Sequence, residues 1–319
     1  MISSLELARI CGVSQGTVDR ALHNRSGISA HTRKKILKAA EEHGYRPHPG
    51  ALEILGKTSN TVGCVIPSIN NIFFMDMLNT IRSGICDLNK RFVITPVGDC
   101  TEMLEVLHDF SARRCPAVVI VPPEDNIPIP PDITRNTTII CLLSPCRAEN
   151  THFLSPDEEI TGRDAAAYLI SKGHRRILHL TYSRNAYAIN ARNRGYARAM
   201  KNHNLTPVTL IEKEVTCLPD RIQREKATAI FCHNDWLALT AIRKLTTAGL
   251  RVPEDVSVLG VDNSPTFISL YPDITTLEYP SKWIRDQAVR IISGKKPLRK
   301  QIRFKIIERA STAEHSKRN

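Results

Sequence analysis

The chain has 319 residues, of which 42% are hydrophobic, and a formal net charge of +12. This length suffices for two or three compact units, and the absence of a long apolar run excludes a membrane-spanning protein. The N-terminus lacks the features of a signal peptide, so we expect a cytoplasmic protein. Nine scattered cysteines without C-x-x-C spacing favour free thiols over disulfides or a metal site.

The positive charge is concentrated at the two ends of the chain. Residues 1–60 carry a net charge of +4 and residues 282–319 one of +9, whereas residues 61–281 are nearly neutral at −1. A basic N-terminal unit suits contact with DNA phosphates. We interpret the basic C-terminal end as a solvated tail, although a non-specific nucleic-acid contact is an alternative.

The N-terminal stretch has the pattern of a helix-turn-helix. Ser3 and Glu6 have the spacing of a capping box. Gly12 stands where a tight turn between helices needs a left-handed backbone, and Ser14 is suited to cap a second helix. Val18 begins the apolar stripe of that helix. A small helical bundle with a solvated polar face is the alternative, but the joint spacing favours DNA binding.

A second helix placed in a major groove would present its N-terminal side chains to the bases. Gln pairs well with adenine and Arg with guanine, so we expect Gln15 and Arg20 to read bases. Gly16 has no side chain and can contribute only close approach. Asp19 would repel phosphates unless it pairs with an Arg or accepts from a cytosine amino group.

A third helix is predicted from residue 30 to residue 43. Ser29 is its cap, and Gly44 follows it at the position where helices commonly end in a left-handed residue. On its outer face, Arg33 and Lys34 are either solvated or in contact with phosphates. Its expected buried stripe consists of Ile36, Leu37 and Ala40.

Pro47 and Pro49 interrupt helix and mark a domain boundary. The apolar residues 50–56 are too few to form a stable helix alone and would order only against a partner.

From residue 61 onward, strand and helix patterns alternate. Strands are expected at 62–67, 92–95, 117–121, 138–143, 177–180, 208–211, 229–232, 256–261 and 302–307, and helices at 73–88, 101–114, 160–172, 191–203, 235–248 and 283–293. Such alternation predicts an α/β fold with parallel sheets covered by helices. About 250 residues is large for one core, so we expect two subdomains with a cleft between them.

Ordered blocks along nearly the whole chain resemble the LacI/GalR family of transcription regulators. The blocks are Gly12-Val13-Ser14 to Arg20, Ser29 to Arg33, Gly44 to Pro47, Asn60 to Gly63, Ile66-Pro67, Phe73-Phe74, Gly173 to Ile177, Arg192 with Gly195-Tyr196, Asn234-Asp235 and, as the most specific, Gly249 to Val258 with Gly260-Val261-Asp262.

The resemblance implies a helix-turn-helix headpiece in residues 1–47, a hinge in 48–60 and an effector-binding and dimerisation domain in 61–319. That domain would consist of two Rossmann-like subdomains, as in periplasmic sugar-binding proteins. The expected subdomains are 61–150 with 278–300, and 151–277 with 301–312. The family also implies a homodimer on a pseudo-palindromic DNA operator.

The resemblance further implies which residues contact the two ligands. For DNA they are Ser14, Gln15, Gly16, Thr17, Arg20, His23, Ser29, Arg33 and, as a minor-groove wedge, Ile54. For the effector they are Asn71, Phe73, Asp157, Arg192, Asn234 and Asp262. The family usually carries Leu at the wedge position and small hydroxyl residues at position 19. The hinge could instead be an ordinary flexible linker, and Asp157 could simply open the following helix.

Carboxylates, amides, an Arg and an aromatic ring at the ends of strands suit a polyhydroxylated ligand. We therefore expect a repressor whose operator affinity is controlled by a small molecule, a sugar or sugar derivative. The alternatives are a cytosolic ligand-binding protein without DNA binding and an α/β enzyme. No Gly-x-Ser-x-Gly elbow, P-loop or metal-spaced cluster occurs, so no enzyme, metal or nucleotide cofactor is expected. His174 is expected to be structural.

Overall fold

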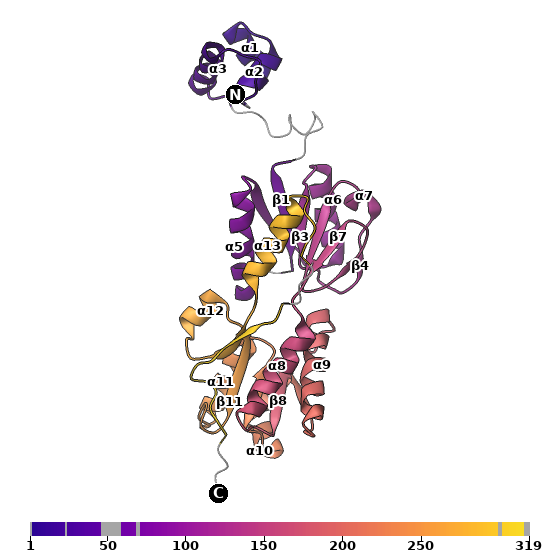
Figure 1. Cartoon of the computed structure of the whole chain (residues 1–319), viewed down its shortest axis with the longest axis vertical. Helices are drawn as coiled ribbons and strands as arrows, with labels where there is room; N and C mark the ends of the chain where they lie inside the picture. The colour runs from indigo at the N-terminus through magenta and orange to yellow at the C-terminus, as the bar shows by residue number, and fades with distance from the viewer. Residues whose placement is uncertain (1, 23, 46–58, 68–70, 299–301, 316–319) are drawn as a thin grey trace. The chain divides into compact units, whose positions relative to one another are not determined.

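The computed structural model describes residues 2–22, 24–45, 59–67, 71–298 and 302–315 (Figure 1). The chain divides into two compact units, residues 1–58 and 59–319. His23, Ile54 and hinge residues 48–58, all singled out by the sequence, lie outside the described residues.

In the described residues of the N-terminal unit there are three helices: α1 (Ser4–Cys11), α2 (Gln15–Leu22) and α3 (Ala30–Glu42). The capping box is confirmed, because Ser3 Oγ accepts from Glu6 N at 3.2 Å and Glu6 Oε2 accepts from Ser3 N at 2.7 Å. Gly12 ends α1 with φ +63°, a left-handed conformation that favours glycine.

Small apolar side chains from all three helices form the core of this unit. Leu7, Val18 and Ile36 are almost completely buried. The prediction for Leu37 was wrong, since this side chain is 45% exposed. Ala39 occupies the buried face instead, because positions 36, 39 and 40 fall on one side of a helix.

The second unit begins with a parallel five-stranded sheet. Its strands, in spatial order, are β2 (Arg91–Pro96), β1 (Thr61–Ile66), β3 (Ala117–Ile120), β5 (Thr138–Leu142) and β7 (Thr151–Leu154). Side chains from α5 (Ile72–Asp87) and α13 (Ser281–Ile292) pack on one face of this sheet. Those from α6 (Cys100–Ala112) and α7 (Pro131–Thr134) pack on the other. β4 (Ile127–Pro128) and β6 (Cys146–Arg147) form a small separate pair.

The unit continues with a six-stranded sheet. Its spatial order is β13 (Lys305–Ile307), β12 (Thr275–Glu278), β11 (Ser257–Asp262), β10 (Ala229–Cys232), β8 (Ile177–Thr181) and β9 (Val208–Ile211), and the pair β12–β13 is antiparallel. One face packs against α8 (Glu158–Ser171) and α9 (Tyr187–Asn202). The other packs against α10 (Leu218–Glu225) and α11 (Asp235–Thr247). Short helices η1 (Glu212–Cys217) and α12 (Pro265–Leu270) complete the element order.

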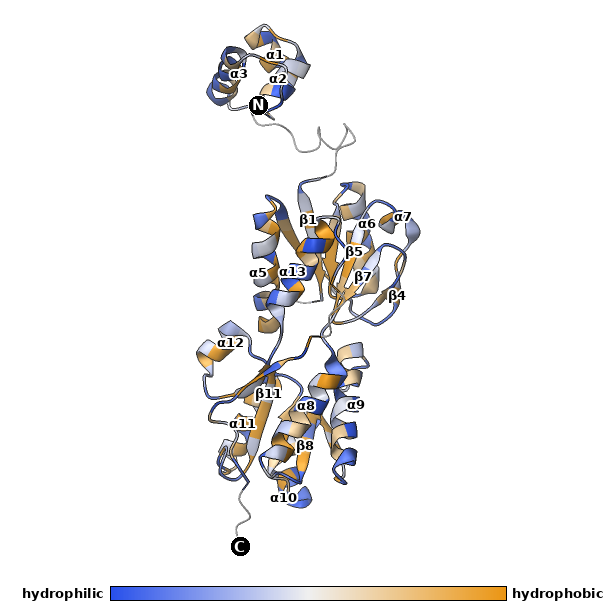
Figure 2. Ribbon diagram, in the orientation of Figure 1, coloured by the Kyte–Doolittle hydropathy of each residue, from blue (hydrophilic) through white to orange (hydrophobic). Residues whose placement is uncertain are grey.

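Figure 2 shows largely hydrophobic strands between helices in which hydrophilic and hydrophobic residues alternate, as expected for sheets covered by helices on both faces. Several predicted boundaries differ from the structure. β7 pairs with β5, so residues 151–154 belong to the first sheet rather than to the second half. The late strand covers only residues 305–307 of the predicted 302–307. Strand β12 was not predicted.

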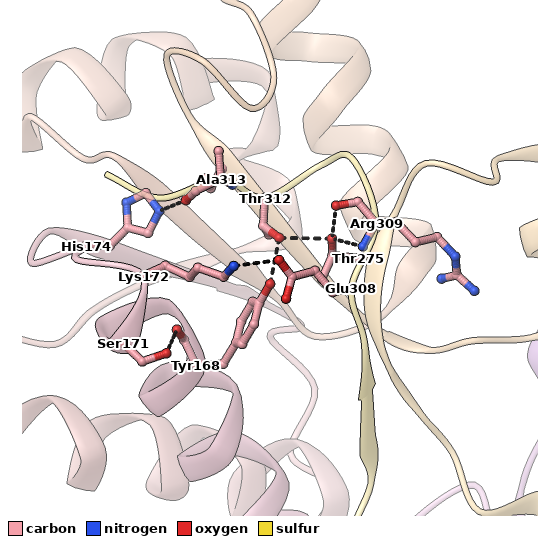
Figure 3. Close-up of polar contacts among 10 residues, drawn as sticks. Tyr168, Ser171, Lys172, His174, Thr275, Glu308, Arg309, Thr312 and Ala313 are labelled. Atoms are coloured by element: carbon pink, nitrogen blue, oxygen red, sulfur yellow. Dashed lines mark hydrogen bonds and ion pairs between the residues drawn. The ribbon is translucent and has the colours of Figure 1, made fainter. Parts of the chain in front are cut away.

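The segment after β13 lies against the second sheet through polar contacts (Figure 3). Lys172 Nζ donates to Glu308 Oε1 at 2.5 Å, and the Tyr168 and Thr312 hydroxyl oxygens are 2.9 Å apart. His174 contacts the Ala313 carbonyl through Nε2 at 3.2 Å and Thr228 Oγ1 through Nδ1 at 2.9 Å. Burial lowers the pKa of His174 to about 4. His174 is therefore structural, as the sequence indicated.

Within the described part of the chain, no helix combines the length and apolar character needed to cross a bilayer.

Candidate functional site

Helix α2 turns the predicted base-reading residues to the surface. Gln15, Gly16 and Arg20 are exposed, whereas Val18 and Ala21 are buried against the rest of the unit. Gln15 Nε2 donates to Ser4 Oγ at 2.6 Å. The exposed face of α2 therefore carries an amide and a guanidinium within two turns of its N-terminus.

Ser14 and Thr17 take part in capping this helix. Ser14 Oγ accepts from Thr17 N at 3.2 Å, and the two hydroxyl oxygens are 2.9 Å apart. Ser29 does the same for α3, since its Oγ accepts from Thr32 N at 3.0 Å. These predicted DNA contacts therefore also set where α2 and α3 begin.

Two arginines hold the region around the end of α2. Arg25 Nη1 donates to Asp19 Oδ2 at 2.8 Å, so the Asp19 carboxylate has a cationic partner. Arg33 Nη1 donates to the carbonyls of Arg20 and Ala21 at 3.1 and 3.2 Å. Arg33 Nη2 donates to the Arg25 carbonyl at 2.5 Å. Arg33 thus joins α3 to the end of α2 by adding a side-chain donor to carbonyls that already accept backbone N–H groups.

A cavity of about 650 Å³ lies in the second unit, lined by residues that follow strands of both sheets. Pro67 and Val121 follow β1 and β3, and His233 follows β10. Open α/β sheets bind ligands at these carboxyl ends. The structure brings five of the six predicted effector residues to this cavity: Asn71, Phe73, Arg192, Asn234 and Asp262.

The sixth, Asp157, is not among the lining residues. Its Oδ1 accepts from Ile160 N at 2.9 Å, and it is the N-cap of α8. The structure thus shows Asp157 in the role that the sequence offered as the alternative, a residue that opens the helix, and its contact with an effector stays a prediction. The physical reason is that a carboxylate at this position satisfies a backbone N–H that the helix leaves unpaired.

The neighbouring Glu158 makes a contact with Arg192 that the sequence did not predict. Its Oε2 accepts from Arg192 Nη2 at 2.6 Å and from Arg192 Nε at 2.9 Å. Arg192 Nη1 also donates to the His233 carbonyl. The Glu158 and Arg192 side chains are 0% and 4% exposed. Burial raises the pKa of Glu158, and Arg192 opposes this change. The guanidinium is thus held rigidly, with a balancing negative charge behind it.

Glycines allow the two helices that carry this ion pair to approach closely. A Cβ at Gly162 would lie 2.0 Å from the Arg192 carbonyl oxygen, and one at Gly195 would lie 1.9 Å from the Glu159 carbonyl oxygen. Without this approach of α8 and α9, Glu158 could not reach Arg192.

Two carboxyl groups, those of Asp235 and Asp262, line the pocket. Asp235 accepts from Thr276 Oγ1 at 2.6 Å and from Asn263 N at 2.8 Å. Burial raises the pKa of Asp235 to about 7. Burial, together with the charge of Asp235, raises the pKa of Asp262 well above its usual value. A raised pKa favours the protonated form of a carboxyl group, which can donate as well as accept hydrogen bonds.

Aromatic and amide groups complete the lining. The Phe73 and Tyr279 rings meet edge to face with centroids 4.9 Å apart. Asn234 caps α11 and lies 3.2–3.3 Å from the Tyr182 hydroxyl. Within the described chain, the Tyr279 hydroxyl and His233 Nδ1 are buried without a hydrogen-bond partner. The pocket thus offers donors, acceptors and ring faces together.

The sequence missed several lining residues, namely Tyr182, Arg184, Glu212, Asp235, Trp236, Ser264 and Tyr279. The sequence feature that could have identified them is their position, because most of them follow a predicted strand within a few residues. In the sequence, Glu158 was recognisable only as a charged residue near the start of a predicted helix.

Comparison with known proteins identifies both units. Residues 5–48 match the family model described as "Bacterial regulatory proteins, lacI family", and residues 166–312 match the "Periplasmic binding protein-like domain". The chain belongs to the LacI family. This membership and the relatives below make it a DNA-binding transcription regulator rather than an enzyme.

LacI-family relatives match almost end to end. The "HTH-type transcriptional repressor PurR" of Aliivibrio salmonicida is 27% identical over 304 residues, covering 92% of this chain and 91% of the relative. "Catabolite control protein A" of Priestia megaterium is 26% identical over 306 residues, covering 92% of each chain.

Solved structures show the same fold. The Lac repressor dimer bound to operator and the anti-inducer ONPF has a TM-score of 0.81 at 22% identity, covering 98% of this chain and 99% of that one. A complex of the transcriptional regulator CelR with cellobiose has a TM-score of 0.67 at 22% identity, covering 98% and 100%.

Proposed function

We propose that this LacI-family regulator is a cytoplasmic repressor. It binds a pseudo-palindromic operator as a homodimer and releases or tightens that contact when an uncharged, hydroxyl-rich ligand occupies the pocket. The exposed face of α2, with Gln15 and Arg20, supports operator reading. Two related headpieces would double the phosphate contacts of one, which supports the dimer.

The main observation in support of an uncharged ligand is the ion pair between Glu158 and Arg192. Three of the five N–H groups of Arg192 are used by protein acceptors, and the charge of its guanidinium is balanced by a fully buried carboxylate. Arg192 therefore supplies hydrogen bonds to a ligand without an uncompensated positive charge. A phosphorylated ligand would gain little from Arg192, because the carboxylate of Glu158 already balances the charge of the guanidinium.

The other lining groups support the same class. Asp262 and Asn234 suit the hydroxyl groups of a sugar, and the Phe73 ring suits its apolar face. Solved relatives were obtained with cellobiose and with D-xylulofuranose. We therefore favour a sugar or sugar derivative over a charged metabolite.

Operator binding can be tested with DNA enriched from a random library by the full-length protein. Fluorescence anisotropy should give an affinity that falls steeply with salt, because phosphate contacts release counterions. Arg20→Ala should weaken binding to the selected sequence at least tenfold. Arg113→Ala, which removes an exposed arginine from the second unit, is the control. Equal binding by Arg20→Ala and wild type would reject the assignment of α2 as the reading helix.

Ligand class can be tested by thermal shift with matched pairs of free sugars and their phosphate esters. A ligand well above its Kd raises Tm, and the free sugars should do so more than the esters. Trp236 lines the pocket and is 58% exposed, so its fluorescence should report the same binding. A larger shift with the phosphate esters would contradict the uncharged class. Ligand binding without specific DNA binding would instead favour the alternative, a cytosolic binding protein.

A further inference from the structure

Asp76 connects helices that belong to different halves of the second unit. Asp76 lies on α5, which packs on the first sheet, whereas Ser264 and Thr266 lie at the start of α12, after β11 of the second sheet. The Asp76 carboxylate accepts from Thr266 N at 2.9 Å and from Thr266 Oγ1 at 2.7 Å. It also accepts from Ser264 Oγ.

We propose that these three residues, called here the Asp76 latch, hold the two halves together at the mouth of the ligand pocket and set how strongly the pocket communicates with operator binding. The proposal rests on the proposed function, to which it adds a device for regulation. Asp76 is 188 residues from Ser264 in sequence, so only the relative position of the halves brings them together.

The Asp76 latch adjoins the residues that line the pocket. Phe73 and Phe74, within one turn of Asp76 on α5, line the cavity, and so do Ser264 and Phe267 from the other half. A movement that widened the cavity at these residues would separate α5 from α12. It would break all three hydrogen bonds at once, because they meet on a single carboxylate.

The latch has the composition expected of a contact that can open. Ser264 is buried, Asp76 is half-buried and Thr266 is exposed, so water can replace the carboxylate's partners when the halves part. Charge-assisted hydrogen bonds at such a site stabilise the closed arrangement without making it permanent. A ligand that bridges the halves would favour the same arrangement, so ligand and latch would support each other.

The experiment compares full-length wild type, Asp76→Ala, Asp76→Asn and Thr266→Val, with Asp87→Ala as the control. Asp87 is an exposed carboxylate at the far end of the same helix. Hydrogen–deuterium exchange without ligand is the first readout. Asp76→Ala should speed exchange at least fivefold in peptides on both sides of the pocket, residues 71–78 and 262–270. Asp76→Asn, which keeps one acceptor oxygen, should give a smaller effect.

A change confined to residues 262–270 would reduce Asp76 to a local cap of α12 and would overturn the proposal. The second readout is operator affinity, which Asp76→Ala should change at least fivefold while Asp87→Ala stays within twofold. Asp76→Ala and Thr266→Val combined should change it less than the product of the single effects, since they remove shared contacts. If wild type binds no operator, the proposed function fails while the exchange data still decide the latch.

Discussion

Glu158 and Arg192 form a fully buried ion pair between α8 and α9, in which one carboxylate oxygen accepts from both Nε and Nη2. Arg192 faces the pocket, and Glu158 stands behind it. The pair explains why these helices approach through glycines, because a wider separation would leave both charges unpaired in the interior.

Glu158→Ala should lower the free energy of unfolding of the second unit by about 3 to 5 kcal/mol, the usual cost of leaving one partner of a buried pair uncompensated. Urea unfolding followed by circular dichroism measures it. Glu159→Ala is the matched control, since Glu159 makes surface ion pairs with Arg194 and Arg198 and should cost less than about 1 kcal/mol. Equal losses for the two variants would contradict a special role of Glu158.

Arg33→Ala should destabilise the N-terminal unit, because its guanidinium donates to three carbonyls around the end of α2. We expect a loss of about 1 to 3 kcal/mol, seen as faster hydrogen exchange in residues 15–22. Lys34→Ala, at the adjacent exposed position, should leave exchange unchanged. Arg20→Ala should also leave it unchanged while weakening operator binding. If Arg33→Ala alters only DNA affinity, the Arg33 side chain contacts DNA phosphate and does not stabilise the end of α2.

Gly16→Ala should have opposite effects on the stability of helix α2 and on operator affinity. A Cβ at this position would have Ser14 Oγ as its nearest neighbour, at 3.8 Å, so it fits. Alanine in place of glycine should stabilise α2 by about 0.5 to 1 kcal/mol. Operator affinity should nevertheless fall, since the new methyl group would stand on the exposed face of the reading helix. Unchanged or tighter operator binding would show that close approach at Gly16 is not needed.

Asp235 should make stability depend on pH. Burial raises its pKa from 3.8 to about 7, so between these values the folded chain holds a proton that the unfolded chain has lost. This contribution is therefore fully present below about pH 4 and is lost as the pH rises to about 7, at roughly 1.4 kcal/mol per pH unit.

The comparison for Asp235 is the difference in unfolding free energy between wild type and Asp235→Asn across this range. A difference is needed because buried His174 and His179, whose pKa values are lowered to about 4, act in the opposite direction. Parallel pH profiles of the two proteins would show that Asp235 ionises normally.

Much of the fold follows from local patterns. Capping residues, Gly12 and the apolar periodicities predicted the three N-terminal helices and most strands and helices of the α/β unit. Strand β12 escaped prediction because it is only four residues long and contains a single apolar residue, so it shows no apolar run. Two of its threonines are completely buried, but they are satisfied by hydrogen bonds to side chains and carbonyls far away in sequence.

Local patterns in the sequence indicated which residues stand at helix starts and strand ends. The resemblance to the LacI/GalR family implied the six effector residues, five of which line the cavity. The pairing of Glu158 with Arg192 could be seen only in the folded chain. The tertiary structure likewise decided that Arg33 turns toward α2 and that Asp76 reaches across to Thr266. Caps and periodicity act within a few residues, whereas the pairing of charges depends on which helices pack together and how closely their backbones approach.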